Sequence, residues 1–390
     1  MENFEYYTPT RYIFGRGSIE KLPDLLRPLG KRVLLTYGGG SIKRIGLYDK
    51  VKDLLKDFEI YELGGIEPNP KYDPSVLEGR KICLEKQIDV VLSVGGGSVL
   101  DCSKAICGVS KTKGDAWEII SGKIPTTGAL PLVDIITLSA TGSEYDSGGV
   151  ITNLETHEKI GYANKYLFPV ASICDPTYVF SVNKYQTAAG VADAINHCLE
   201  DYFCDSHTRL SDDMLISTMR SLMVNGPKAI INPSDYESRG EIMIACSLAC
   251  NGILSLGNSF GGWPMHAIEH ELSAYYDITH GVGLAIITPR WMKKILQINP
   301  ATKERLVYLG VNLFSLSEEL SEEEIAKLTI ECFFSFFEQL GIPMYLDEVG
   351  IPIEGIEEMV NHLYRNNRML KGFTPLEKID VREILLDCYK

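Results

Sequence analysis

Two glycine runs in the first half of the chain each lie between a β-rich segment and a helical one. Gly38-Gly39-Gly40-Ser41 follows residues 32–37, and Gly95-Gly96-Gly97-Ser98 follows residues 88–94. Strands that alternate with helices predict a parallel sheet covered on both faces. We expect strands at 32–37, 57–63, 88–94 and 132–138, and a hairpin at 149–152 and 159–162 attached to the same α/β domain.

The composition of the chain changes near residue 180. Beyond this point β-rich runs nearly vanish, and helical windows such as 188–203 and 213–223 dominate. A chain of 390 residues is long enough for two domains. We therefore expect a Rossmann-like α/β domain at 1–180 and an all-helical domain at 181–390.

The overall composition excludes several classes of partner. The chain has 52 acidic and 38 basic residues, a formal net charge of -14, which disfavours nucleic acids and anionic membranes because both require a basic surface. No apolar run approaches the ~18 residues of a membrane span, and the first residues lack the pattern of a signal peptide. The 10 cysteines form no CxxC pair, which is typical of reduced thiols in a cytoplasmic protein.

Both glycine runs have the chemistry of a phosphate-binding loop. Glycines let the backbone approach a ligand, and the N-terminus of the following helix offers unpaired N–H groups and a partial positive charge. Neither run fits the GxGxxG fingerprint of an ordinary Rossmann domain. Where NAD-binding proteins place a carboxylate for the ribose 2′-hydroxyl, this chain has glycine and serine followed by Lys43 and Arg44, which favours NADP(H).

Four of the seven histidines cluster in the second half of the chain at spacings typical of metal ligands. Asp193 and His197 are four residues apart in a helical window, as are His266 and His270, so each pair shares a helix face. His280 follows shortly after. Imidazoles with a carboxylate suit Fe(II), Zn(II) or a related ion that acts as a Lewis acid. We therefore expect the α/β domain at 1–180 to bind a nucleotide and the helical domain at 181–390 to bind a metal, with the active site in the cleft between them. A nucleotide site combined with a metal site indicates hydride transfer to or from a carbonyl carbon.

A competing motif indicates a different reaction. His266-x-x-Glu269-His270 matches the inverted zinc-hydrolase pattern, in which Glu269 would be the general base. This alternative makes the glycine runs and the Asp193/His197 pair incidental. A nucleotide-binding protein without catalytic activity is a further possibility, but it would not need aligned metal ligands.

Together the motifs resemble the iron-containing (group III) alcohol dehydrogenases, in particular their NADP-dependent butanol dehydrogenase and aldehyde reductase branch. The resemblance covers nearly the whole chain and rests on Phe14-Gly15-Arg16-Gly17, Pro68-Asn69-Pro70, GGGSxxDxxK at 95–104, Thr141-Gly142-Ser143-Glu144, 190–197 and 266–281. It implies a dehydroquinate synthase-like fold. Phosphate-releasing lyases of that type are a second alternative, yet residues 260–280 contain no Lys or Arg for a substrate phosphate.

The resemblance also implies roles for individual residues. A metal ion, Fe(II) in first place and Zn(II) in second, would be bound by Asp193, His197, His266 and His280. His270 would lie near the substrate as a proton relay, and with Asp101 it forms the candidate catalytic pair. The cofactor would contact Gly38, Gly39, Gly40, Ser41, Asn69, Gly96, Gly97, Ser98, Asp101, Thr137, Ser139, Lys159 and Tyr178. Asp146 stands where related reductases often carry Asn, so it would either contact the cofactor or face solvent.

The expected activity is hydride transfer between NADP(H) and a short-chain primary alcohol or aldehyde such as butanol or butanal. Trp117, Phe260 and Trp263 are candidates for an apolar substrate pocket, with ordinary core or surface packing as the alternative for each. The resemblance further suggests a homodimer.

Overall fold

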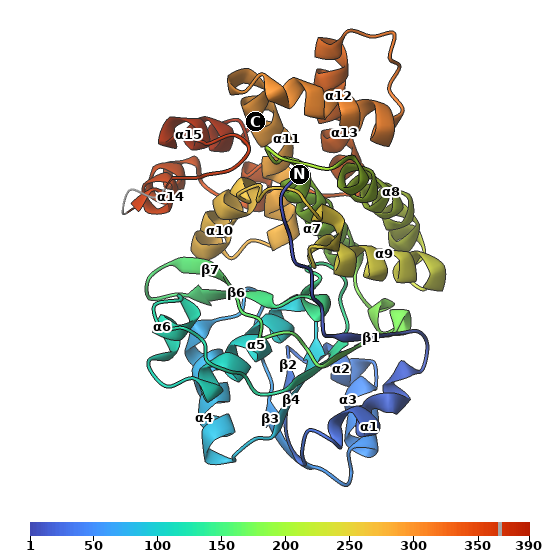
Figure 1. The fold of residues 1–390 in the computed structure, drawn as a ribbon, viewed down its shortest axis with the longest axis vertical. Helices are drawn as coiled ribbons and strands as arrows, with labels where there is room; N and C mark the ends of the chain where they lie inside the picture. Colours follow the sequence, from blue (N-terminus) through green and yellow to red (C-terminus); the bar gives the residue numbers. More distant parts are fainter. Residues whose placement is uncertain (366–368) are drawn as a thin grey trace. The chain divides into compact units, whose positions relative to one another are not determined.

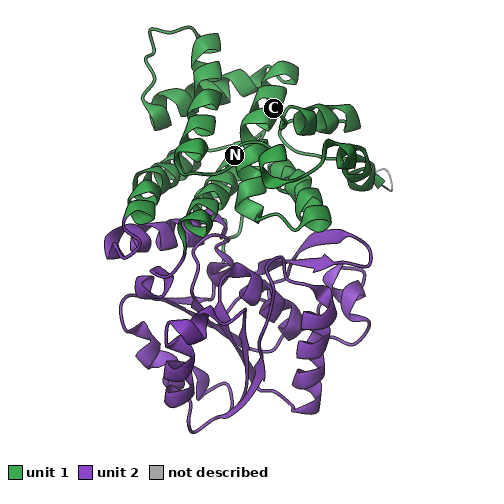
Figure 2. Cartoon of the chain, turned by 180° about the vertical axis from the view of Figure 1, so that it is seen from behind, with its two compact units in different colours: residues 1–6, 183–231, 252–390 green, residues 7–182, 232–251 purple. Residues whose placement is uncertain are grey.

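In the computed structural model, which describes residues 1–365 and 369–390, the chain divides into two compact units (Figure 2). The α/β unit comprises Tyr7–Val182 and Asn232–Asn251. The helical unit comprises Met1–Tyr6, Asn183–Ile231 and Gly252–Lys390. Each unit is therefore assembled from segments that are distant in the sequence.

A six-stranded parallel sheet forms the centre of the α/β unit (Figure 1). Its order is β1-β8-β5-β4-β2-β3. The bounds are β1 Arg11–Phe14, β2 Arg32–Tyr37, β3 Glu59–Leu63, β4 Val90–Gly95, β5 Leu132–Ile136 and β8 Ala171–Cys174. The four predicted strands are confirmed as β2 to β5, with ends that differ by two residues or fewer. The two strands β1 and β8 were not predicted.

Alternate residues of the central strands face opposite hydrophobic cores. Val33 and Leu35 of β2 belong to one core, and Leu34 belongs to the other. The first core is closed by α1 (Leu22–Leu26) and α3 (Leu47–Leu54), and the second by α4 (Leu77–Glu85), α5 (Gly97–Lys111) and α6 (Ala116–Ile120). The sheet is thus buried on both faces, as a parallel sheet requires.

The predicted hairpin is a separate two-stranded antiparallel sheet. It consists of β6 (Gly148–Asn153) and β7 (Glu158–Ala163) and packs on α5. Helix α9 (Tyr236–Ala249) also belongs to the α/β unit, although it lies far along the chain. Its Ser247 donates a hydrogen bond to Glu144 of the α/β unit.

The helical unit contains no strand among its described residues. Its helices are α7 Lys184–Tyr202, α8 Arg209–Ile231, α10 Pro264–Tyr276, α11 His280–Ile298, α12 Ala301–Phe314, α13 Glu322–Gln339, α14 Ile356–Leu363 and α15 Lys378–Leu386. Three of them, α7, α10 and α11, pack on one another and carry the histidine pattern. In the part of the chain that the structure describes, no helix has the length and apolar character needed to cross a membrane.

Candidate functional site

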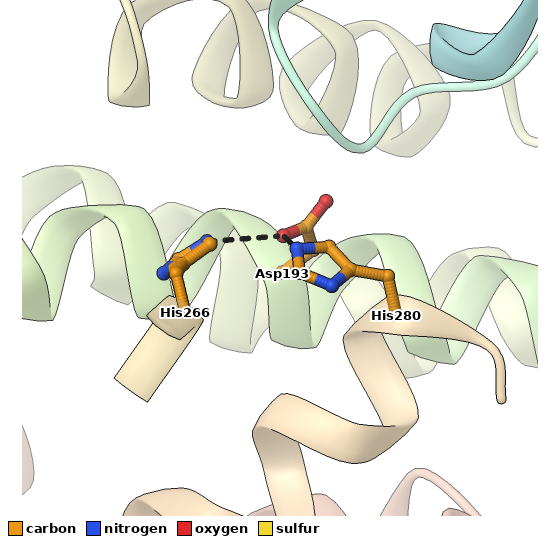
Figure 3. Close-up of side chains that lie close together, drawn as sticks. All are labelled: Asp193, His266 and His280. Atoms are coloured by element: carbon orange, nitrogen blue, oxygen red, sulfur yellow. Dashed lines mark ion pairs between the residues drawn. The ribbon is translucent and has the colours of Figure 1, made fainter. Parts of the chain in front are cut away.

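Three helices of the helical unit bring the expected metal ligands together. Asp193 and His197 lie on consecutive turns of α7, His266 in the first turn of α10, and His280 at the start of α11. Asp193 Oδ1 lies 3.4 Å from His197 Nε2, 3.9 Å from His266 Nε2 and 3.7 Å from His280 Nε2. Figure 3 shows the side chains of Asp193, His266 and His280 converging from their separate helices.

These atoms have the spacing and chemistry of ligands to one ion. Ligands about 2.0–2.2 Å from a tetrahedral ion lie about 3.3–3.6 Å from one another. Potential ligand atoms of Asp193, His266 and His280 all lie within 4.8 Å of one another. Asp193 Oδ1 and His266 Nε2 are buried without a hydrogen-bond partner among the described residues, a cost that a cation would relieve. These residues therefore fit a divalent metal.

His197 lies beside this three-residue group. Its ring stacks on His266 and on Trp263, with centroid distances of 5.0 Å and 5.3 Å. Burial lowers the pKa of His197 to about 4, so its imidazole is neutral near pH 7. A neutral imidazole has a lone pair to offer a metal.

Two buried glutamates contact the Nδ1 atoms of two expected ligands, His266 and His280. Glu200 Oε1 lies 3.2 Å from His266 Nδ1 and accepts a hydrogen bond from the His266 backbone N–H at 3.0 Å. Glu269 contacts His280 Nδ1 and accepts a hydrogen bond from Ser273 Oγ. Glu200 was not predicted from the sequence, although its place seven residues after Asp193 puts both on one face of α7.

His270 lies one helical turn after His266, and its ring centroid is 5.6 Å from that of His280. With Glu269 and His280 it forms a second group whose potential ligand atoms lie within 4.8 Å of one another. Glu269, the general base of the hydrolase alternative, contacts His280 Nδ1 and accepts a hydrogen bond from Ser273 Oγ.

Of the three aromatic candidates for a substrate pocket, Trp263 lies beside the expected metal ligands. Its ring centroid lies 4.6 Å from that of His266. Its side chain is hydrogen-bonded to Asp201, whose pKa is raised to about 6 by burial. Phe260 is 79% exposed, and Trp117 belongs to the α/β unit, where its ring centroid lies 5.3 Å from that of Tyr72.

The two glycine runs lie at one edge of the parallel sheet. Strands β2 and β4 are neighbours with Tyr37 opposite Val94, so both runs leave the same carboxyl edge. Gly96 is the N-cap of the 15-residue helix α5. A side chain at position 97 is excluded because its Cβ would lie 2.5 Å from Thr141 Oγ1. Glycine loops that lead into a helix at this edge have the geometry that binds a pyrophosphate.

Other predicted cofactor contacts follow the same edge. Thr137 lies just beyond β5, and its N–H donates to Gly95 O at 2.8 Å. Ser139 Oγ is buried and has no hydrogen-bond partner within residues 1–365 and 369–390. Tyr178 follows β8, and burial raises its pKa to about 12. Asn69 after β3 and Lys159 on β7 are both buried.

Asp101 and Asp146 have partners inside the α/β unit. The Asp101 carboxylate accepts from Ser143 Oγ at 2.7 Å and from Val150 N at 2.9 Å, and burial raises its pKa to about 6. Asp146 Oδ1 accepts from Lys104 Nζ at 2.7 Å, and its side chain is 14% exposed, so it does not face solvent. Both carboxylates thus stabilise the segment that borders the second glycine run.

Comparisons with known proteins find relatives along the whole chain. The family described as Iron-containing alcohol dehydrogenase matches residues 9–176, and Fe-containing alcohol dehydrogenase family, C-terminal, matches residues 187–389. NADH-dependent butanol dehydrogenase A of Clostridium acetobutylicum is 44% identical over 393 residues, 100% of either chain. NADPH-dependent aldehyde reductase YqhD of Escherichia coli is 34% identical over 368 residues, 93% of either chain. The crystal structure of NADH-dependent butanol dehydrogenase A from Thermotoga maritima matches with a TM-score of 0.95 at 40% identity, covering 100% of this chain and 99% of the other.

Proposed function

Because the chain belongs to the iron-containing alcohol dehydrogenase family, we propose that it interconverts a short-chain primary alcohol such as butanol and its aldehyde with NADP(H). The observation that carries this proposal is the group of unsatisfied ligand atoms around Asp193 Oδ1. The ion, Fe(II) in first place and Zn(II) in second, would be held by Asp193, His197, His266 and His280. When bound, the metal supplies a Lewis acid for the substrate oxygen, and the nicotinamide supplies or accepts the hydride.

The chain's own residues orient the substrate and manage its proton. Trp263 lies against the rings of His197 and His266 and offers an apolar surface for a short alkyl chain. His270, beside His280, is the proposed group that holds or releases the proton of the substrate oxygen at Nε2. Asp101 contributes by holding Ser143 and the start of the hairpin in place.

The coenzyme proposal rests on the surroundings of the first glycine run. Lys43 follows it in α2 (Ser41–Arg44), and its ammonium lies 4.9 Å from the Tyr37 ring centroid and 4.8 Å from that of Tyr48. The two rings hold a cation next to residues 38–41. The nearby Glu62 carboxylate accepts hydrogen bonds from Tyr37, Tyr48 and Lys52, so its charge is compensated. A held cation without an opposing free carboxylate favours a 2′-phosphate.

NADH is the competing coenzyme. The similar proteins at 44% and 40% identity are named NADH-dependent, whereas the aldehyde reductase at 34% identity is named NADPH-dependent. The two coenzymes differ by one phosphate group, so a direct comparison of their kinetics decides between them.

Butanal-dependent oxidation of NADPH and of NADH tests the proposal. The chain is stripped of metal and then reloaded with Fe(II) or Zn(II). We expect oxidation of the coenzyme by the reloaded chain and none by the stripped chain. The kcat/KM ratio of NADPH to NADH should exceed one and fall about tenfold in Lys43→Met, the loss of one charge-assisted contact. Lys50→Met, which removes an exposed lysine paired with Glu20, is the matched control and should keep the ratio.

Two outcomes would contradict different parts of the proposal. Absence of oxidation with either coenzyme after reloading contradicts the dehydrogenase activity. Equal or faster oxidation of NADH contradicts the coenzyme assignment and leaves the dehydrogenase activity standing.

We propose the homodimer from the resemblance alone, and the cytoplasmic location from the 10 cysteines, which form no CxxC pair. Sedimentation of the purified chain tests the first. Fractionation of cells that express the chain tests the second.

A further inference from the structure

Glu200 and Glu269 are not among the four expected ligands, yet each contacts one of them. Both are buried, with 1% and 0% of their surface exposed. We propose that Glu200 and Glu269 are positioning residues, which orient His266 and His280 and thereby set the affinity of the metal centre. This inference rests on the metal site of the proposed function and extends it to two further residues.

The contacts determine which ring nitrogen carries the proton. Glu200 Oε1 already accepts the backbone N–H of His266, so it also faces the ring as a hydrogen-bond acceptor. His266 Nδ1, 3.2 Å from Glu200 Oε1, therefore carries the proton, and Nε2 keeps its lone pair. Glu269 accepts from Ser273 Oγ through Oε1 and contacts His280 Nδ1 through Oε2, so we assign Glu269 as the acceptor of the His280 Nδ1–H as well. In both rings the lone pair belongs to the nitrogen that faces Asp193 Oδ1, so both carboxylates select the tautomer that binds a metal.

Glu200 also determines where the backbone of His266 lies. Helix α10 begins after Trp263, whose side chain caps no amide of the described helix. The amides of the first turn therefore need another acceptor. Glu200 of α7 accepts from the backbone N–H of His266 at 3.0 Å, and a negative charge at a helix N-terminus is favourable. One carboxylate thus holds the backbone and the ring of the same ligand.

Glu269 is itself held in place, whereas His197 has no such support. Ser273, one turn further along α10, donates a hydrogen bond from Oγ to Glu269. His197 Nδ1 is buried without a hydrogen-bond partner in the described part of the chain, and its ring is held by stacking. Carboxylate support is therefore a property of two particular imidazoles and not of every buried ring in the cluster.

Glu271 provides a matched control within the same helix. It is 7% exposed, and its Oε2 lies 2.7 Å from His362 Nδ1. It therefore repeats the pairing of a buried carboxylate with an imidazole, but on a histidine that is not an expected ligand.

The test measures metal affinity, which is independent of turnover. The full chain is stripped with a chelator and titrated with Zn(II) or Co(II) in competition with a chromophoric chelator. Glu200→Gln and Glu269→Gln should each weaken binding about 10–100-fold, whereas Glu271→Gln should leave it unchanged. The visible absorption of bound Co(II) reports ligand geometry, and it should change in Glu200→Gln and Glu269→Gln but not in Glu271→Gln.

Folding of each variant is checked by circular dichroism. Where a glutamine variant does not fold, Glu200→Asp or Glu269→Asp takes its place, because the charge is kept while the carboxylate is withdrawn from the ring. These variants should still bind metal more weakly than the wild type. Affinities equal to the wild type, or equal weakening in Glu271→Gln, would overturn the inference alone. A wild-type chain that binds neither ion would overturn both the inference and the metal centre of the proposed function.

Discussion

Buried carboxylates gather in both units, but their charges are compensated in different ways. In the α/β unit, Asp146 pairs with Lys104, a fully buried ammonium that also donates to the carbonyl oxygens of Ser143 at 2.7 Å and Gly148 at 2.6 Å. In the helical unit, Asp193 and Glu200 pair with imidazoles. In the α/β unit the carboxylate charge is compensated by a lysine of the chain itself. In the helical unit the arrangement of carboxylates and imidazoles is that of a site whose charge is compensated by a bound cation.

This difference distinguishes carboxylates with a structural role from expected metal ligands more clearly than residue type does. A buried polar atom costs free energy unless it is paired. Asp101 and Asp146 occupy positions expected near the cofactor, yet their oxygens are satisfied by the α/β unit itself. Asp193 Oδ1 and His266 Nε2 have no hydrogen-bond partner among the described residues. The convergence of these unsatisfied atoms is therefore the observation that supports the proposed metal centre.

Removal of the buried Lys104 ammonium should have the largest effect on the stability of the α/β unit. Lys104→Met removes the cation paired with the Asp146 carboxylate and the donor to three carbonyl oxygens, and we expect a loss of about 3–5 kcal/mol in the free energy of unfolding. Urea unfolding followed by hydrogen exchange of peptides from β6 and β7 measures this loss locally.

Asp146→Asn is the matched control for that variant. It keeps an oxygen acceptor for Lys104, so its cost should be smaller, about 1–2 kcal/mol. If Lys104→Met cost no more than Asp146→Asn, the α/β cluster would not depend on its internal cation, and the contrast between the units would fail.

A smaller effect concerns the pH dependence of the same unit. Burial raises the pKa of Glu144 to about 6 from its usual 4.5, and the side chain accepts a hydrogen bond from Ser247. The folded state therefore binds the proton more tightly than the unfolded state, and ionisation costs it about 2 kcal/mol. This cost is absent below about pH 4.5 and develops as the pH rises through about 6.

Glu144→Gln removes the titrating carboxyl group and with it the cost of ionising this buried side chain. The free energy of unfolding of the wild type should rise by about 2 kcal/mol relative to Glu144→Gln between about pH 7 and about pH 4.5. Calorimetric unfolding of both proteins across that range provides the measurement. A difference that does not vary with pH would show that Glu144 is as easily ionised as an exposed glutamate.

The strands and the metal ligands differ in how well they could be predicted. Strands β2, β4 and β5 have β-rich composition, and β3 alternates polar and apolar residues, so local sequence patterns located all four. Strands β1 and β8 have four residues each, too few to show a period. Helix α9 was not predicted, and a local pattern does not say to which unit a helix belongs.

Spacing along a helix identified Asp193 with His197 and His266 with His270, because residues four apart share a face. The pairing of Glu200 with His266 spans 66 residues, so local spacing carries no sign of it. The partners of Asp101 and Asp146 lie on other elements for the same reason. Short-range patterns thus revealed the candidate ligands. Three-dimensional contacts were needed to distinguish them from residues that orient a ligand, such as Glu200, and from carboxylates that stabilise the α/β unit, such as Asp146.

The metal content of the purified chain tests the central claim most directly. After dialysis of chains loaded with Zn(II), the wild type and His270→Ala should retain about one ion per chain, and His280→Ala should retain almost none, because His280 faces Asp193 Oδ1 through Nε2. Retention in His280→Ala together with loss in His270→Ala would contradict the account.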